Sequence, residues 1–120
     1  MDRKALAKAY KTTARPMGIY GIRNTVSGRI LVGWSVDLPS AINRDRAALG
    51  FGGHPNAALQ LDWNDHGPTA FAFEVLDTLV APERADYAPA QDLKVLESLW
   101  LERLAPYGDR GYLKPPRVAT

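Results

Sequence analysis

The chain has 120 residues, of which 46% are hydrophobic and 23% charged, with 15 Lys and Arg, 13 Asp and Glu, and no Cys. This length gives room for one domain with its own core, and the composition excludes a disordered chain. Without cysteine, a disulfide framework, a zinc–thiolate site, an iron–sulfur cluster and a cysteine nucleophile are all excluded.

Turn residues and hydrophobic periodicity predict the following elements in chain order. We expect a helix at 2–12, strands at 18–23 and 29–34, helices at 38–49 and 55–67, a strand at 70–76 and a helix at 91–104. Gly28 lies in the loop of the predicted hairpin, and Asp37 is a candidate N-cap with Pro39 in the first helical turn after it. The last helix is the most clearly amphipathic, because four large apolar residues recur on one stripe.

The charge is divided unevenly along the sequence. Residues 1–60 hold nine Lys and Arg against three Asp and Glu, a net charge of +6, whereas residues 61–120 hold six against ten, a net charge of −4. This asymmetry predicts a basic surface that faces nucleic acid or an acidic partner. No apolar run approaches the ~20 residues that span a bilayer, and the first residues lack a signal-peptide core. We therefore expect a cytoplasmic protein with no membrane partner.

Two side chains, Glu97 and Tyr20, are candidates for chemistry. Glu97 lies on or beside the apolar stripe of the last helix, and buried carboxylates are rare unless they are paired, metal-bound or catalytic. The alternative is an edge position from which the carboxylate reaches solvent. Tyr20 lies in the middle of the first strand, where the alternative is an ordinary core residue. His54 and His66 have no acidic pattern around them that completes a zinc site.

Five short blocks occur in a fixed order between Gly18 and Tyr112. They are Gly-Ile-Tyr-x-Ile-x-Asn from Gly18, Val-Gly-x-Ser-x-Asp-Leu from Val32, Gly-x-His-x-Asn-x-x-Leu-Gln-x-x-Trp from Gly52, Phe-x-Phe-Glu-Val-Leu from Phe71, and Leu-Glu-x-x-Trp-Leu from Leu96. With these blocks the sequence resembles the GIY-YIG nuclease family.

The resemblance implies an α/β (α+β) domain in which helices flank a small three-stranded antiparallel sheet. Residues 18–113 would form this domain, residues 1–17 an N-terminal helical extension, and residues 114–120 a C-terminal tail that we expect to be disordered. Active members of the family cut DNA by hydrolysing phosphodiester bonds.

The resemblance also assigns roles to residues. Tyr20 matches the tyrosine that helps to activate the attacking water, and Glu97 matches the glutamate that holds one divalent ion. His54 matches a position near the site, where we expect it to contact phosphate; the alternative is a loop-capping or exposed histidine. Mg²⁺ or Mn²⁺ is the expected metal, since an oxygen ligand suits a hard ion that polarises a phosphoryl oxygen.

Arginine side chains are the expected contacts to phosphate. The family has its arginine at the position of Ala41. Helix geometry places Arg44 one turn beyond Ala41, so Arg44 is a candidate phosphate clamp. The alternative is a solvated arginine. The predicted nucleic-acid-binding residues are Arg23, Arg29, Arg44 and Arg46.

Four positions depart from the family pattern. Leu31, Ala41, Asp45 and Leu113 stand where a tyrosine, an arginine, a histidine and an asparagine are usual. Losing one positioned polar or acid–base group lowers a rate by about 10² to 10⁴.

Two functional hypotheses follow. The first is a metal-dependent DNA endonuclease, and the second is a catalytically degenerate domain that binds DNA, RNA or a protein without cutting. A domain that serves only as a scaffold is a third reading, because fold does not dictate function. The chain has no zinc finger or helix-turn-helix, so an active enzyme would depend on a protein partner for specificity or have little.

Overall fold

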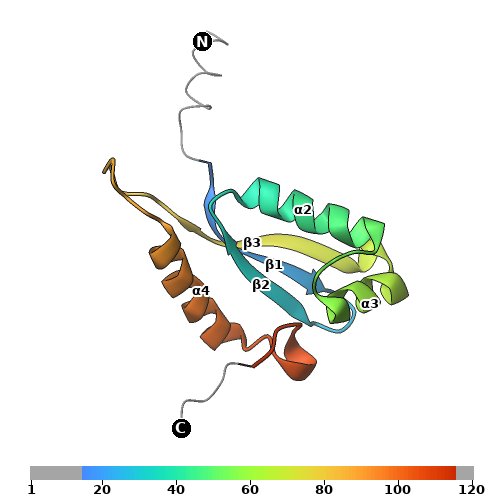
Figure 1. Cartoon of the computed structure of the whole chain (residues 1–120). Helices are drawn as coiled ribbons and strands as arrows, with labels where there is room; N and C mark the ends of the chain where they lie inside the picture. The colour runs from blue at the N-terminus through green and yellow to red at the C-terminus, as the bar shows by residue number, and fades with distance from the viewer. Residues whose placement is uncertain (1–14, 116–120) are drawn as a thin grey trace.

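The structure, a computed structural model, describes residues 15–115 (Figure 1). Its elements are β1 (Met17–Asn24), β2 (Ile30–Ser35), α2 (Leu38–Phe51), α3 (Ala57–His66), the 3-10 helix η1 (Pro68–Ala70), β3 (Phe71–Leu79), α4 (Ala90–Leu104) and the 3-10 helix η2 (Gly108–Arg110). Every predicted strand and helix after residue 17 is confirmed, with β3 extending further than expected. The predicted helix at 2–12 lies outside the described residues, as does most of the predicted C-terminal tail.

The three strands form one antiparallel sheet in the order β2-β1-β3. Tyr20 of β1 lies opposite Gly33 of β2 and Val75 of β3. The pairing with β3 shifts register between Ile19 and Tyr20, and β2 is left as an edge strand. The predicted α+β fold with a three-stranded antiparallel sheet is confirmed.

Helices cover both faces of the sheet, with α2 and α3 on one side and α4 on the other (Figure 1). Successive strand residues point to opposite faces, so Ile22 packs with α2 and α3 while Ile19 packs with α4. The core of the first face contains Ile22, Leu31, Leu49, Leu59, Ala70, Phe71 and Tyr112. The core of the second face contains Ile19, Ile30 and Val32, against which Leu76, Leu96, Trp100, Leu101 and Leu104 pack.

Side-chain caps explain where α2 and α3 begin. Asp37 accepts a hydrogen bond from the Ser40 backbone N–H at 3.2 Å, and Asn56 accepts one from the Leu59 backbone N–H at 3.0 Å. Both satisfy amide groups that the helix itself leaves free. The end of α2 is set by Gly52, whose φ of 81° is left-handed. Within residues 15–115 there is no helix with the length and apolar character of a membrane span.

Candidate active site

Tyr20 is held inside the sheet by the glycine beside it. A Cβ atom at Gly33 would lie 2.9 Å from both Cζ and Oη of Tyr20, so only glycine leaves room for the ring across β2. The tyrosine is 6% exposed and packs with Leu38, Ala41 and Ile42 of α2. Its hydroxyl therefore faces α2 rather than open solvent.

A buried pair of ionisable side chains, Asp45 and His54, lies beside Tyr20. His54 Nε2 is 3.4 Å from Asp45 Oδ1, and the two side chains are 4% and 9% exposed, respectively. This separation is long for a hydrogen bond, and both Asp45 Oδ2 and His54 Nε2 are buried without a hydrogen-bond partner. An unsatisfied buried polar group destabilises a protein by about 1–3 kcal/mol. Arg44, with its side chain 70% exposed, places Nε 3.7 Å from Asp45 Oδ1.

The same neighbours determine how Tyr20 ionises. Burial, followed by the charge of the Asp45 carboxylate, raises the pKa of Tyr20 to about 12, against an opposing effect of the Arg44 guanidinium. Tyr20 is therefore fully protonated at neutral pH. The structure brings Tyr20, Arg44 and His54 together, and Asp45 is the residue that joins them.

Two hydrogen bonds fix the orientation and the tautomer of His54. Its backbone N–H donates to Gln60 Oε1 at 3.0 Å, and its Nδ1 accepts from the Asn56 backbone N–H at 3.0 Å. A neutral imidazole that accepts at Nδ1 carries its proton on Nε2. His54 thus presents an N–H group toward Asp45, and its orientation does not favour direct contact with phosphate.

Glu97 stands apart from this cluster on α4, which packs against the opposite face of the sheet. Among residues 15–115, neither a hydrogen bond nor an ion pair joins it to Tyr20, Asp45 or His54. The side chain is half-buried, and this burial raises the pKa of its carboxyl. No group of three or more His, Asp and Glu in the described part of the chain could hold a metal ion, so Glu97 would be a lone carboxylate ligand.

Three of the four departures from the family pattern pack into the protein. Leu31 is 8% exposed in the core under α2 and α3, and Ala41 is 3% exposed against Tyr20. Leu113 packs against the cores on both faces. The fourth, Asp45, places a carboxylate inside the site.

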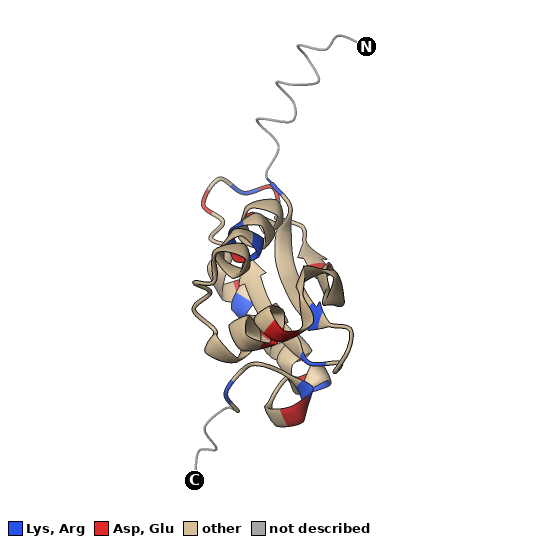
Figure 2. Cartoon of the chain, turned by 90° about the vertical axis from the view of Figure 1, so that its right-hand side faces the viewer, with Lys and Arg blue, Asp and Glu red and all other residues tan. Residues whose placement is uncertain are grey.

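Most of the predicted nucleic-acid contacts have partners within the protein. Arg23 Nε is 2.9 Å from Glu74 Oε1, Arg29 Nη1 is 3.1 Å from Asp62 Oδ2, and the Arg46 guanidinium lies 4.5 Å from the centre of the Phe73 ring. In Figure 2 the basic and acidic residues alternate over the described chain instead of forming one basic stripe. Three of the predicted contacts form ion pairs. Among these three, Arg44 has the most exposed side chain.

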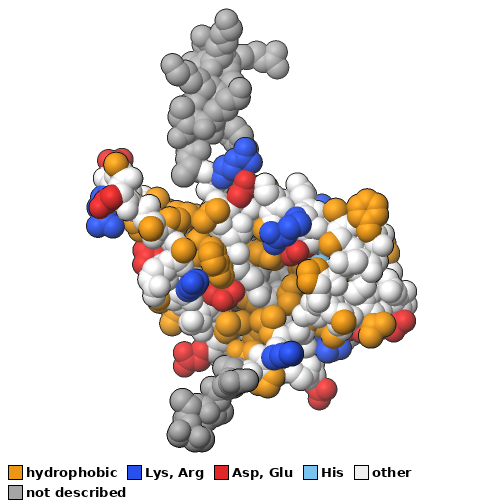
Figure 3. Space-filling view, in the orientation of Figure 1, with side chains coloured by type: hydrophobic (Ala, Val, Ile, Leu, Met, Phe, Trp, Pro, Cys, Tyr) orange, Lys and Arg blue, Asp and Glu red, His pale blue; other side chains and the backbone are white. Residues whose placement is uncertain are grey.

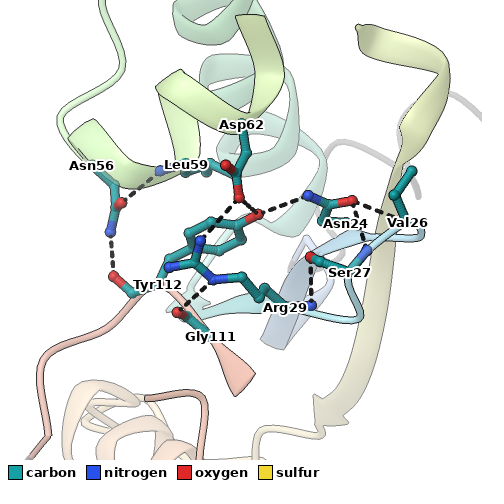
Figure 4. Close-up of polar contacts among 9 residues, drawn as sticks. All are labelled: Asn24, Val26, Ser27, Arg29, Asn56, Leu59, Asp62, Gly111 and Tyr112. Carbon is teal, nitrogen blue, oxygen red and sulfur yellow. Dashed lines mark hydrogen bonds and ion pairs between the residues drawn. The ribbon is translucent and has the colours of Figure 1, made fainter. Parts of the chain in front are cut away.

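A second polar cluster, absent from the sequence predictions, joins the hairpin to α3 and to the segment after α4 (Figure 4). The Tyr112 hydroxyl donates to Asp62 Oδ2 at 2.7 Å and accepts from Asn24 Nδ2 at 3.1 Å. Arg29 donates to Asp62 Oδ2 at 3.1 Å, and its guanidinium lies 4.5 Å from the centre of the Tyr112 ring. Every polar group named here has a partner.

The surface over β2, between α4 and α2, faces the viewer in Figure 3. Hydrophobic side chains gather there, and single basic and acidic side chains lie among and beside them. Tyr20 crosses Gly33 on one face of β2, and α4 contacts β2 on the other face.

The protein has a three-stranded antiparallel sheet with helices on both faces, and Tyr20 of the central strand packs under α2. These features define a small nuclease-like domain. A structural comparison supports that class. The catalytic domain of homing endonuclease I-TevI superposes with a TM-score of 0.63 and 29% sequence identity, over 80% of this chain and 95% of that domain. A mutant catalytic domain of intron endonuclease I-TevI gives a TM-score of 0.66 at 26% identity, over 82% and 92%.

Neither a scan against protein-family models nor a search of curated proteins finds a match. The solved structures belong to a GIY-YIG nuclease. The resemblance drawn from the sequence motifs is therefore confirmed at the level of the fold: the chain has the GIY-YIG nuclease fold.

Proposed function

We propose that the protein is a divalent-metal-dependent endonuclease that hydrolyses DNA phosphodiester bonds. The observation that supports this proposal is the buried cluster of Tyr20, Asp45 and His54, at positions that the resemblance assigns to the family's active site. Buried ionisable groups with unsatisfied atoms destabilise a fold, and they concentrate at functional sites. A site released from function would be expected to fill with apolar side chains instead.

The edge of β2 is the surface on which DNA would lie. Tyr20 approaches this edge from the face under α2, and Glu97 projects from α4, which contacts β2 from the other face. Arg44 is largely exposed beside Tyr20 and would hold a phosphate oxygen. A backbone phosphate at this edge would reach groups from both faces.

Glu97 is the residue that would hold the metal ion. Mg²⁺ accepts one or two carboxylates and keeps several of its waters, so a lone carboxylate fits. Because burial raises the pKa of Glu97, its charged form gains from a cation nearby. A bound Mg²⁺ or Mn²⁺ would polarise a phosphoryl oxygen and stabilise the leaving alkoxide.

The test is incubation of supercoiled plasmid with the protein and Mg²⁺ or Mn²⁺, with a chelator as the control. We expect slow conversion to nicked and linear forms. The rate should be low, because each missing polar group lowers it by about 10² to 10⁴. A plasmid that stays supercoiled at protein excess would overturn the proposed activity.

Two variants of α4 distinguish the effect of losing the Glu97 carboxylate from the effect of changing any carboxylate on this helix. Glu97→Gln removes the charge that would hold the ion, and we expect cleavage to be lost together with the response to added Mn²⁺. Glu102→Gln removes an exposed carboxylate from the same helix and should cut like the wild type. Equal cleavage by the wild type and Glu97→Gln would contradict the metal-ligand assignment.

A second candidate function is binding of nucleic acid or a protein without cleavage. The packing of Leu31 and Ala41 favours it, because hydrocarbon occupies the places of a polar tyrosine and an arginine. Binding to DNA would weaken steeply with added salt, since each neutralised phosphate releases counterions. Salt-dependent binding without nicking would identify this function, whereas the absence of any DNA binding would point to a protein partner.

A further inference from the structure

The last residue of α2 is a large apolar side chain that the fold does not use. Phe51 is 91% exposed, more than any other large hydrophobic residue of the described chain. It packs into none of the three hydrophobic clusters described for residues 15–115. Single exposed apolar residues are common on protein surfaces, so exposure alone assigns no role to Phe51, and the residues around it have to decide.

Glycines flank Phe51 in the sequence at positions where packing does not demand them. A Cβ atom at Gly50, Gly52 or Gly53 would meet no atom within 4 Å. Only Gly52 has a positive φ that favours glycine, 81°. Gly50 lies in the last turn of α2, where alanine would stabilise the helix more. Because no side chain stands on either side of Phe51, a flat ligand can reach the face of its ring.

The exposed surface of α2 that leads to Phe51 is positively charged. Arg44 and Arg46 are exposed, whereas Asp45, the one acidic residue of this helix, is buried. Arg44 and Phe51 are seven positions apart, which is close to two turns, so they lie on the same side of the helix. The helix rise separates them by about 10 Å along the axis. Phe51 therefore lies at the end of a basic surface.

A basic surface that ends in an uncovered aromatic ring fits a nucleic acid with unpaired bases. Arginine side chains bind phosphate groups, and an aromatic ring stacks on the face of any base. In a continuous duplex the neighbouring bases cover these faces, whereas unpaired bases can be splayed out and stacked on a protein ring. A protein partner would require a contiguous apolar patch, and Phe51 is the one large hydrophobic residue of α2 that is exposed.

We propose that Phe51 stacks on an unpaired base of a DNA strand that lies along α2, with a phosphate of the same strand held by Arg44. The inference rests on the proposed function and deepens it, because it names the class of substrate: DNA with unpaired bases beside the cleaved bond. The separation of about 10 Å between Arg44 and Phe51 corresponds to about three nucleotides of B-form DNA. The stacked base would lie within that distance of the phosphate.

Binding measured without metal tests the stacking separately from cleavage. Fluorescence anisotropy of a labelled single-stranded oligonucleotide, at low salt and with a chelator present, gives the dissociation constant of each variant. We expect Phe51→Ala to bind about tenfold more weakly than the wild type. Phe51→Leu keeps an apolar side chain without a ring and should bind as weakly as Phe51→Ala. Phe51→Trp keeps a ring and should bind at least as tightly as the wild type.

Three controls accompany these variants. Leu99→Ala removes an exposed apolar side chain from α4, on the opposite face of the sheet, and should bind like the wild type. A duplex of the same sequence should bind the wild type more weakly than the single strand does, and Phe51→Ala should change its affinity less. Because Phe51 packs into no hydrophobic cluster, the thermal melting of its variants should match that of the wild type.

The outcomes that overturn the inference are specific. Equal affinity of the wild type and Phe51→Ala for the single strand would contradict it. Full binding by Phe51→Leu would replace stacking with a general apolar contact. Sedimentation that shows a self-associating wild type and a monomeric Phe51→Ala, with equal DNA binding, would make Phe51 a contact between copies of the chain.

The inference and the proposed function fail separately. A wild type that binds single strands through Phe51 but does not nick plasmid, with Mg²⁺ or Mn²⁺ present, overturns the endonuclease activity and leaves the stacking role standing. A wild type that nicks plasmid, with single-strand binding that is equal in Phe51→Ala, overturns the stacking role and leaves the activity standing. Nicking together with a tenfold loss of single-strand binding in Phe51→Ala supports both.

Discussion

The structure holds two tyrosines beside aspartates, and the two arrangements differ in how well their polar groups are satisfied. Tyr112 donates to Asp62 at 2.7 Å, accepts from Asn24 at 3.1 Å, and lies under the Arg29 guanidinium. Around Tyr20, in contrast, Asp45 Oδ2 and His54 Nε2 are buried without partners. Both tyrosines have a pKa raised to about 12, so the pKa alone does not distinguish them.

What distinguishes the two tyrosines is whether the buried polar groups around them have hydrogen-bond partners. A fully satisfied polar network rigidifies a fold, whereas unsatisfied buried groups destabilise it. The Tyr112 cluster joins the hairpin, α3 and the C-terminal segment, which is a structural role (Figure 4). The Tyr20 cluster instead contains buried polar atoms without partners, which supports the proposed catalytic role more than a structural one. Four predictions test this distinction.

The largest effect is expected from Tyr20→Phe, which removes only the hydroxyl. We expect plasmid nicking to fall by about 10² to 10⁴, because the proposed activity assigns the activation of water to this hydroxyl. Stability should change by less than about 1 kcal/mol, as this hydroxyl has no well-satisfied set of bonds. Comparing nicking rates with urea unfolding checks both parts, and a variant as active as the wild type would show that Tyr20 has no part in cleavage.

The same substitution at Tyr112 should have the opposite consequence. Tyr112→Phe leaves the buried Asn24 amide without its partner and removes a bond to Asp62, so we expect a loss of about 1–3 kcal/mol in the free energy of unfolding. Nicking under conditions where the variant is folded should be unchanged. If urea denaturation shows equal stability for Tyr112→Phe and the wild type, the structural role of this cluster is wrong.

Removing the charge of Asp45 and removing the charge of Asp62 should change the stability of the protein in opposite directions. Both changes should be smaller than that of Tyr112→Phe. Asp45→Asn takes away a buried charge whose pairing is incomplete, and we expect the protein to become more stable by about 1 kcal/mol. Asp62→Asn weakens the ion pair with Arg29, which is partly exposed, and should destabilise by a similar amount. Melting temperatures of the two variants, measured side by side, should fall on opposite sides of the wild type.

The smallest effect concerns alkaline pH. The folded-state pKa of about 12 for Tyr20 and for Tyr112 lies above the ordinary value of 10.0. The stability from these protonated hydroxyls is complete below pH 10.0 and is lost as the pH rises toward 12. Urea midpoints across this range should fall for the wild type and fall less for either Tyr→Phe variant. Equal slopes in all three proteins would mean that neither tyrosine is linked to folding.

Much of the fold could be predicted because its signals are local. Asp37, the predicted N-cap, begins α2 through a bond to a residue three positions later. Asn56 caps α3 in the same way, although the sequence pattern predicted the start of that helix at residue 55. The resemblance to the GIY-YIG family added the three-stranded antiparallel sheet flanked by helices. The buried stripe of α2 also contained a signal for Asp45, since a charged residue stands where the spacing from Ala41 to Leu49 requires an apolar one.

The partners of the polar residues could not be predicted, because they come from distant parts of the chain. Asn24 and Tyr112 are 88 positions apart, and Arg23 and Glu74 are 51 apart. Neither separation follows a helical or strand period. The expectation that Arg23 and Arg29 bind nucleic acid was drawn from residue type alone. It stays a prediction, and in the structure both side chains are paired with carboxylates.

The sequence by itself determined the elements, their order along the chain and the resemblance to the GIY-YIG nuclease fold, because caps, periodicity and motifs act over a few residues. Only the tertiary structure decided which aspartate is satisfied and which is not. That distinction depends on burial and on the directions of hydrogen bonds, both of which arise when α2, the loop before α3 and the edge of the sheet come together.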